Sequence, residues 1–319
     1  MSVRVMSPFG GLLEDFGFAL DPAPEVHEQL NDEYHRLGEF IAADSDTRFR
    51  ASAAIYPQGS KALGTVVRPL RDEDELDLDA VYRRDIHKES TTQARLKQTT
   101  GEQLEAFVQL RRGEGIAVEL EDNRRCWTLR YRGFHIDVLP ALPDASEEAA
   151  SVGGEPILIT DTKLRDWQAS NPKGFIDWFR TSMRRPFVAR RDAMAKSGGV
   201  EVKSIEDDAF KTPLQVAVQI LKRHRDVYFR EQQSERPISV IITTLAGRAY
   251  QNELDPYAAV ESIITAAPRL IAKDRQGRWV VANPTDSAEN FADKWNEDVR
   301  KPEAFFAWLK RVASDLAVA

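Results

Sequence analysis

The chain has 319 residues, enough for one large domain or two ordinary ones, and its 42% hydrophobic and 30% charged residues are typical of a globular protein. Its formal net charge of −7 argues against a broad surface for long nucleic acids, because such surfaces depend on clustered Lys and Arg. No apolar run is long enough to cross a bilayer, and the first residues lack the apolar run of a secretory signal. A single cysteine, Cys126, excludes an internal disulfide. We therefore expect a soluble cytoplasmic protein without a membrane partner.

Helical and strand-like patterns are mixed in the first half of the chain. From 25 to 41, apolar or aromatic residues recur every three or four positions, which predicts an amphipathic helix. From 55 to 139, short β-type runs are separated by Gly, Pro and charged clusters, and a helix is predicted among them over 92–112. The predicted strands include 76–82, 116–120, 126–131 and 134–139. We therefore expect a mixed or antiparallel sheet with helices.

The second half is predicted to be mainly helical. After about residue 160, apolar residues take helical spacing, and four predicted helices open with a proline, which the first turn tolerates. The predicted helices cover 213–228, 237–250, 256–271, 290–295 and 302–316, and a short strand is expected at Trp279. A basic stretch over 180–196 is either a solvated helix face or a phosphate-facing edge of a cleft. The expected fold class is α+β, with one domain over 1–165, a helical domain over 166–319 and a cleft between them.

Two aspartates alternate with apolar residues in the strand predicted over 76–82. Side chains of a strand alternate between its faces, so Asp77 and Asp79 share one face while Leu76, Leu78 and Ala80 occupy the other. Two neighbouring carboxylates repel each other unless a cation or a base neutralises them, and oxygen ligands of this kind suit Mg²⁺. Taken alone, the pair is equally compatible with an exposed strand edge that carries charges.

A third aspartate, Asp137, interrupts the apolar strand predicted over 134–139. A lone carboxylate in such a strand is costly unless it is paired or binds a metal, and three converging carboxylates together with triphosphate oxygens form a two-metal site. Upstream, Gly59 permits close approach of the backbone to a phosphate, and Ser60 offers a hydroxyl and an N–H group at a predicted helix start. Gly-Ser alone is usually a turn. The Gly-Ser pair becomes a more specific signal because Asp-x-Asp and then a strand aspartate follow it in the chain.

The order of these motifs resembles the DNA polymerase β-like nucleotidyltransferase superfamily. More narrowly, it resembles the bacterial CD-NTases, relatives of cyclic GMP-AMP synthase and oligoadenylate synthase. The resemblance rests on Gln58-Gly59-Ser60, on Asp77-Leu78-Asp79, on the strand over 134–140 and on helical stretches at 213–226, 237–245 and 283–295. It implies a polymerase β-like nucleotidyltransferase core followed by an oligoadenylate-synthase-like helical domain, with the active site in the cleft between them.

The resemblance also implies roles for the residues of these motifs. Asp77 and Asp79 are expected to bind both of two Mg²⁺ ions, for which Mn²⁺ can substitute. Asp137 is expected to bind the ion that activates the attacking ribose hydroxyl. Gly59 and Ser60 are expected to hold the triphosphate of the donor nucleotide.

Four further residues are assigned through the same resemblance or through their neighbours. Lys222 and Ser239 resemble additional triphosphate contacts, with a solvated helix end and a helix cap as the respective alternatives. Gln58 is interpreted as a base or sugar contact. His135 is interpreted as a residue that supports the strand that carries Asp137.

The implied activity is that of a Mg-dependent nucleotidyltransferase. It would condense NTPs, ATP and/or GTP, into a cyclic di- or trinucleotide second messenger with release of pyrophosphate. By resemblance, the product activates an effector in CBASS antiphage defence, and a HORMA-like or ubiquitin-ligase-like partner regulates the enzyme. The alternatives are a linear oligonucleotide synthase or RNA-tailing enzyme, and a catalytically inactive nucleotide sensor. The acidic net charge weighs against a long RNA acceptor, and the three intact aspartates weigh against an inactive sensor.

Overall fold

The chain is described by a computed structural model over residues 7–43, 53–71, 74–163, 166–198 and 210–318. It divides into two units. The sheet unit comprises Pro22–Ala62 and Arg71–Ile176, and the helical unit comprises Met1–Asp21, Leu63–Leu70 and Asp177–Ala319. This division departs from the expected domains 1–165 and 166–319, because α1 (Pro8–Ala19) and the segment Leu63–Leu70 belong with the helical unit.

A seven-stranded sheet organises the sheet unit. Its order is β1-β2-β5-β4-β3, and β6 and β7 extend it from β5. β2 pairs with β5 in parallel and all other pairs in this sheet are antiparallel, so the sheet is mixed. The strands are β1 (Ala53–Pro57), β2 (Leu76–Arg84), β3 (Glu119–Asp122), β4 (Trp127–Arg130), β5 (Phe134–Pro143), β6 (Ile157–Ile159) and β7 (Gln168–Ser170).

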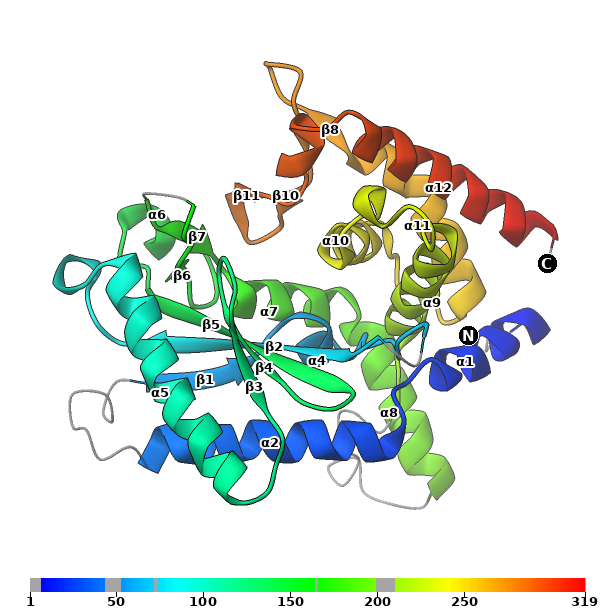
Figure 1. The fold of residues 1–319 in the computed structure, drawn as a ribbon. Helices are drawn as coiled ribbons and strands as arrows, with labels where there is room; N and C mark the ends of the chain where they lie inside the picture. Colours follow the sequence, from blue (N-terminus) through cyan, green and yellow to red (C-terminus); the bar gives the residue numbers. More distant parts are fainter. Residues whose placement is uncertain (1–6, 44–52, 72–73, 164–165, 199–209, 319) are drawn as a thin grey trace. The chain divides into compact units, whose positions relative to one another are not determined.

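Two long helices, α2 (Pro24–Ala43) and α5 (Gln93–Gly113), pack against this sheet (Figure 1). They contribute apolar side chains that are at most 2% exposed, among them Leu37 and Phe107. Removing such side chains from water is the main favourable contribution to folding. The remaining elements of the unit are α4 (Gly59–Leu63), η1 (Lys88–Ser90), α6 (Glu147–Ala150) and the start of α7 (Pro172–Ser182).

Burial alternates along β2 as its sequence predicts. Leu76, Leu78 and Ala80 are 4% exposed or less, whereas Asp77 is exposed and Asp79 is half-buried. In β5, the residues Phe134, Ile136 and Val138 are buried and alternate with half-buried His135, Asp137 and Leu139. The two strands therefore turn their polar side chains away from the apolar core.

The helical unit is built around α9 (Pro213–Tyr228), which contacts α1, α10, α11 and α12. Thr212 opens α9 with a capping box completed by Gln215, and Asp255 caps α11. Asp255 also accepts hydrogen bonds from the backbone N–H and the hydroxyl of Ser7, which fixes the start of α1. The other helices are α8 (Arg184–Gly198), α10 (Ser239–Ala249), α11 (Pro256–Leu270), α12 (Arg300–Val318), η3 (Gln233–Glu235) and η4 (Asp293–Asn296).

The helix predicted over 290–295 is wrong. Asn290 ends β11 (Asp286–Asn290), which pairs with β10 (Ala282–Asn283), and only η4 follows. Asn290 accepts a hydrogen bond from the N–H of Val281 and donates one to the carbonyl of Trp279, so its side chain organises a turn region rather than a helix. The short strand at Trp279 is confirmed as β9 (Trp279–Val280), which pairs with β8 (Ala272–Lys273). Among the described helices, none has both the length and the apolar character needed to span a bilayer.

Candidate active site

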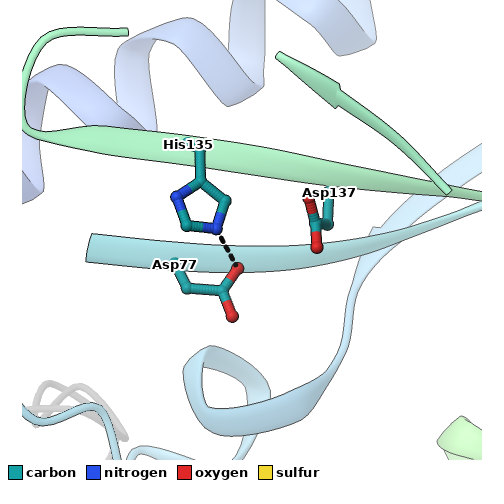
Figure 2. A group of neighbouring side chains, drawn as sticks. All are labelled: Asp77, His135 and Asp137. Atoms are coloured by element: carbon teal, nitrogen blue, oxygen red, sulfur yellow. Dashed lines mark ion pairs between the residues drawn. The ribbon is translucent and has the colours of Figure 1, made fainter. Parts of the chain in front are cut away.

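The parallel pairing of β2 with β5 brings the aspartates of the two strands together. In this register Asp77 lies opposite His135, and Asp79 lies opposite Asp137. Because the polar residues of both strands leave the same side of the sheet, their side chains gather there. Figure 2 shows Asp77 of β2 facing His135, with Asp137 two residues further along β5.

Asp77, His135 and Asp137 each offer one ligand atom, and these atoms lie within 4.8 Å of one another. His135 Nε2 lies 3.3 Å from Asp77 Oδ1 (Figure 2). Two carboxylates and one imidazole suit a divalent cation, with the oxygen donors favouring Mg²⁺ or Mn²⁺. The arrangement therefore fits the metal use expected of this site.

Asp79 is placed differently from the other two aspartates. Within the described residues it does not belong to the 4.8 Å group, and its carboxylate lies against Gly59 instead. β1 pairs with β2 so that Pro57 lies opposite Ala80, and the N–H of Gln58 donates to the carbonyl oxygen of Asp79 at 2.8 Å. The Gly-Ser motif is thereby held beside β2, the strand that carries Asp77 and Asp79.

Gly59 starts α4 with a φ of +59°, a backbone conformation that favours glycine. Ser60 follows it within the first turn of α4 and is half-buried. The structure thus brings together Gln58, Gly59, Ser60 and the aspartates of β2 and β5 within the sheet unit.

The ionisable groups around Asp137 shift one another's pKa. Burial raises the pKa of Asp137, a hydrogen bond from Thr128 opposes this effect, and the nearby Asp77 carboxylate adds to it. The hydrogen bond with Asp77 raises the pKa of His135. A divalent cation would offset the repulsion between the carboxylates of Asp77 and Asp137, which is one contribution to the raised pKa of Asp137.

Cys126 lies close to the carboxylate of Asp137. Burial raises the pKa of its thiol to about 12, and the charge of Asp137 contributes to the increase. The raised pKa keeps the thiol protonated at physiological pH, so Cys126 does not offer a thiolate nucleophile.

His135 takes part in a wider charged network that the sequence did not reveal. Its Nδ1 lies 3.1 Å from Glu75 Oε2, and Glu75 also pairs with Arg130. Arg130 in turn donates to both carboxylate oxygens of Glu121, at 2.8 and 3.0 Å. His135 is thus held between Glu75 and Asp77, which agrees with the supporting position expected for it. It also belongs to the group that could bind a metal ion.

The two remaining candidates, Lys222 and Ser239, belong to the helical unit. Lys222 is 5% exposed and donates to the carbonyl of Thr65 at 2.8 Å, so the alternative of a solvated helix end is wrong. Ser239 is the first residue of α10, and its hydroxyl accepts a hydrogen bond from Arg225 at 2.9 Å. The helix cap is Ile238, which excludes the simple capping role for Ser239.

Other side chains of α9 also bind the backbone of the segment Leu63–Leu70. Gln215 donates to the carbonyl of Leu63 at 3.0 Å and Gln219 to that of Val66. Arg223 donates to the carbonyl of Arg68 at 2.6 Å. The segment that follows the Gly-Ser motif is consequently anchored along one side of α9.

Comparisons with known proteins agree with these features. The family model of the Second Messenger Oligonucleotide or Dinucleotide Synthetase domain, SMODS, matches residues 11–182. A c-di-GMP synthase from Roseivirga ehrenbergii is 32% identical over 279 residues, which cover 87% of this chain and 69% of that protein. The cyclic dinucleotide synthase CdnG from Bradyrhizobium diazoefficiens is 24% identical over 98% of this chain and 76% of its own length.

Solved structures show the same fold. The structure of Bradyrhizobium diazoefficiens CdnG in complex with GTP matches with a TM-score of 0.77 at 21% identity, covering 98% of this chain and 92% of that chain. Vibrio cholerae DncV cyclic AMP-GMP synthase, in complex with nonhydrolyzable GTP, matches with a TM-score of 0.57 at 15% identity, covering 97% and 79%. The expected α+β fold, the nucleotidyltransferase class and the resemblance to bacterial CD-NTases are thereby confirmed. The chain belongs to the SMODS family of second messenger oligonucleotide or dinucleotide synthetases.

Proposed function

We propose that this chain condenses two nucleoside triphosphates into a cyclic dinucleotide that contains guanine, with cyclic di-GMP as the first candidate product. The choice of GTP is supported by the relative named c-di-GMP synthase and by the GTP complex of the similar CdnG structure. Within this chain, the parallel pairing that gathers Asp77, His135 and Asp137 beside the Gly-Ser motif carries the proposal.

The metal would be held by Asp77, His135 and Asp137, and Mg²⁺ is the expected ion, with Mn²⁺ as a substitute. When bound, a divalent cation supplies charge neutralisation for the triphosphate and lowers the pKa of an attacking hydroxyl. We infer that Asp79, which lies beside Gly59, completes the site for a second ion.

The donor triphosphate would be bound by the backbone of Gly59 and by the hydroxyl and N–H of Ser60, with Gln58 as a base or sugar contact. Lys222 and Ser239 stay predicted triphosphate contacts. A ribose oxygen forms a bond to the α-phosphorus while the bond from that phosphorus to the α,β-bridging oxygen breaks. Pyrophosphate leaves with the electron pair of the broken bond, and the proton of the hydroxyl passes to solvent. A second attack of the same kind closes the ring. The chain's contribution is mainly to position the two nucleotides.

The product can be identified directly. Purified protein is incubated with Mg²⁺ and GTP alone, ATP alone or all four NTPs, and the product is treated with phosphatase and analysed by mass spectrometry. A phosphatase-resistant product with the mass of a cyclic dinucleotide supports the proposal. A product with phosphatase-sensitive ends indicates a linear synthase, and no product from any mixture indicates an inactive nucleotide sensor.

Variants of the aspartates connect the product to the site. Asp77→Asn and Asp137→Asn should each reduce product formation by at least about 100-fold, since removing a key electrostatic group commonly costs 10²–10³ in rate. Asp15→Asn is a matched control, because Asp15 is exposed on α1 of the helical unit. Equal activity of the site variants and the control would contradict the assignment.

We further infer, from the family resemblance, that the product activates an effector protein in CBASS antiphage defence and that the enzyme acts in the cytoplasm. A HORMA-like or ubiquitin-ligase-like protein is the expected regulatory partner. Co-purification of the tagged chain from cells that carry its neighbouring genes would test the partner. An effector assay with the purified product would test the downstream step.

A further inference from the structure

Thr128 of β4 lies directly opposite Asp137 in the antiparallel pairing of β4 with β5. It is 2% exposed, and its hydroxyl donates a hydrogen bond to Asp137 Oδ1. A threonine in a strand has a restricted χ1 angle, so its hydroxyl is held in one direction more firmly than that of a serine. One oxygen of the Asp137 carboxylate is therefore fixed by a buried neighbour.

Asn123 determines where the proton of the Thr128 hydroxyl points. The side-chain Nδ2 of Asn123 donates to Thr128 Oγ1 at 2.8 Å. An amide nitrogen can only donate, and a hydroxyl carries a single proton, so the Thr128 proton is left for Asp137. The hydrogen bonds run in one direction, from Asn123 through Thr128 to Asp137.

The turn that carries Asn123 is itself anchored. The N–H of Asn123 donates to the carbonyl of Cys126 at 3.1 Å, and its carbonyl accepts a hydrogen bond from Lys97. Lys97 is 5% exposed on α5 and also pairs with Asp122. Arg124, the next residue of the turn, donates to the fully buried carboxylate of Asp161 at 2.7 Å. Asn123 is thereby fixed to both α5 and the loop that contains Asp161.

We propose that Thr128, oriented by Asn123, is a positioning residue that fixes the Asp137 carboxylate for metal binding. This inference rests on the proposed function, because it takes Asp137 to be a metal ligand. Because one oxygen of its carboxylate accepts from the buried Thr128 hydroxyl, Asp137 has less freedom to rotate, and its carboxylate is held in the ligand group that includes Asp77 and His135. Groups that orient metal ligands in this way typically contribute about 10- to 100-fold to metal affinity or activity.

The test measures Mn²⁺ binding to the full chain without nucleotide, by the electron paramagnetic resonance signal of free Mn²⁺. Thr128→Val keeps the shape but removes the hydroxyl, and we expect it to raise the Kd for Mn²⁺ by about 10- to 100-fold. Thr128→Ser restores the hydroxyl and should bind Mn²⁺ nearly as well as the wild type. Asn123→Ala, at an exposed position, should weaken binding in the same direction but by less, and it serves if Thr128→Val does not fold.

Thr100→Val is the matched control. Thr100 is also 2% exposed, but its hydroxyl donates to the carbonyl of Leu96 within α5. If Thr128→Val and Thr100→Val weaken Mn²⁺ binding equally, or if Thr128→Val leaves the Kd unchanged within about threefold, the positioning role is overturned.

Nucleotide turnover distinguishes this inference from the proposed function. If Thr128→Val weakens Mn²⁺ binding but the wild type forms no product from any NTP mixture, the proposed function fails and the positioning role stands. If the wild type forms the cyclic product and Thr128→Val requires no more Mn²⁺ for half-maximal rate, the positioning role fails and the proposed function stands.

Discussion

The carboxylate of Asp79 occupies the space in which a side chain on Gly59 would begin. An ideal Cβ on Gly59 would lie 2.3 Å from Asp79 Oδ2, which is far closer than any real contact. Gly59 also has a φ of +59°, where L-residues other than glycine are strained. Glycine is therefore needed at position 59 for two independent reasons: the positive φ of its backbone and the close approach of the Asp79 side chain from β2.

Gly59→Ala is predicted to abolish most nucleotide condensation. The added methyl group must displace Asp79 or the start of α4, and a misplacement of about 1 Å can cost about 10²-fold in rate. Pyrophosphate release under saturating GTP and Mg²⁺ measures the effect. Gly113→Ala is the control, since a Cβ there meets nothing within 4 Å. Wild-type turnover of Gly59→Ala would show that the close approach of Asp79 to Gly59 is not required for catalysis.

His135→Gln is predicted to lower metal affinity by at least about 10-fold, because it removes a proposed ligand as well as the hydrogen-bonding partner of Asp77. The imidazole spans from Glu75 to Asp77, with contacts of 3.1 and 3.3 Å, and a glutamine cannot reproduce both. The Mg²⁺ concentration that gives half-maximal turnover measures this change. His87→Gln, at an exposed position, should leave that concentration unchanged. An unchanged Mg²⁺ requirement in His135→Gln would remove His135 from the metal site.

Local patterns in the sequence predicted the parts of the site that depend on one segment. Alternation along β2 and β5 placed Asp77, Asp79 and Asp137 on the polar sides of their strands, and the structure agrees. The parallel register that sets Asp79 opposite Asp137 is a long-range pairing, which alternation within one strand does not contain. For the same reason the Thr128 contact could not be predicted, because it depends on which residue of β4 faces Asp137.

The boundaries of the two units also could not be predicted from local sequence patterns. α1 precedes the sheet unit in sequence but packs with α9 and α11, where Gly17 allows close approach of Val216. Such docking depends on shape complementarity between distant segments. The resemblance to CD-NTases predicts a triphosphate contact at Lys222, but the buried position of this side chain against Thr65 is known only from the structure.

Gln219→Leu is predicted to lower the free energy of unfolding by about 1–3 kcal/mol, because it removes two hydrogen bonds, one of them to a carboxylate. Gln219 is fully buried and donates to Asp21 Oδ1 at 3.0 Å and to the carbonyl of Val66. Urea unfolding measures the change. Gln98→Leu, on the exposed face of α5, should change stability by less than about 0.5 kcal/mol. Equal effects of the two substitutions would show that α9 does not stabilise the segment Leu63–Leu70 through this side chain.

Asp161→Asn is predicted to destabilise the fold in a pH-dependent way. Burial acts to raise the pKa of Asp161, but hydrogen bonds from Arg124, Arg125 and the N–H of Lys163 outweigh it and hold the pKa well below its ordinary value. A depressed pKa in the folded state stabilises the protein above the unfolded-state pKa of about 3.9, and this contribution is lost as the pH falls toward the folded-state value. Urea unfolding at pH 7 should therefore show Asp161→Asn to be less stable than the wild type by about 1–3 kcal/mol, and the gap should narrow below about pH 4. Asp315→Asn, which weakens exposed pairs with Arg311 and His224, should show a much smaller gap at pH 7. A difference between wild type and Asp161→Asn that does not change with pH would mean that the carboxylate charge of Asp161 contributes no stability.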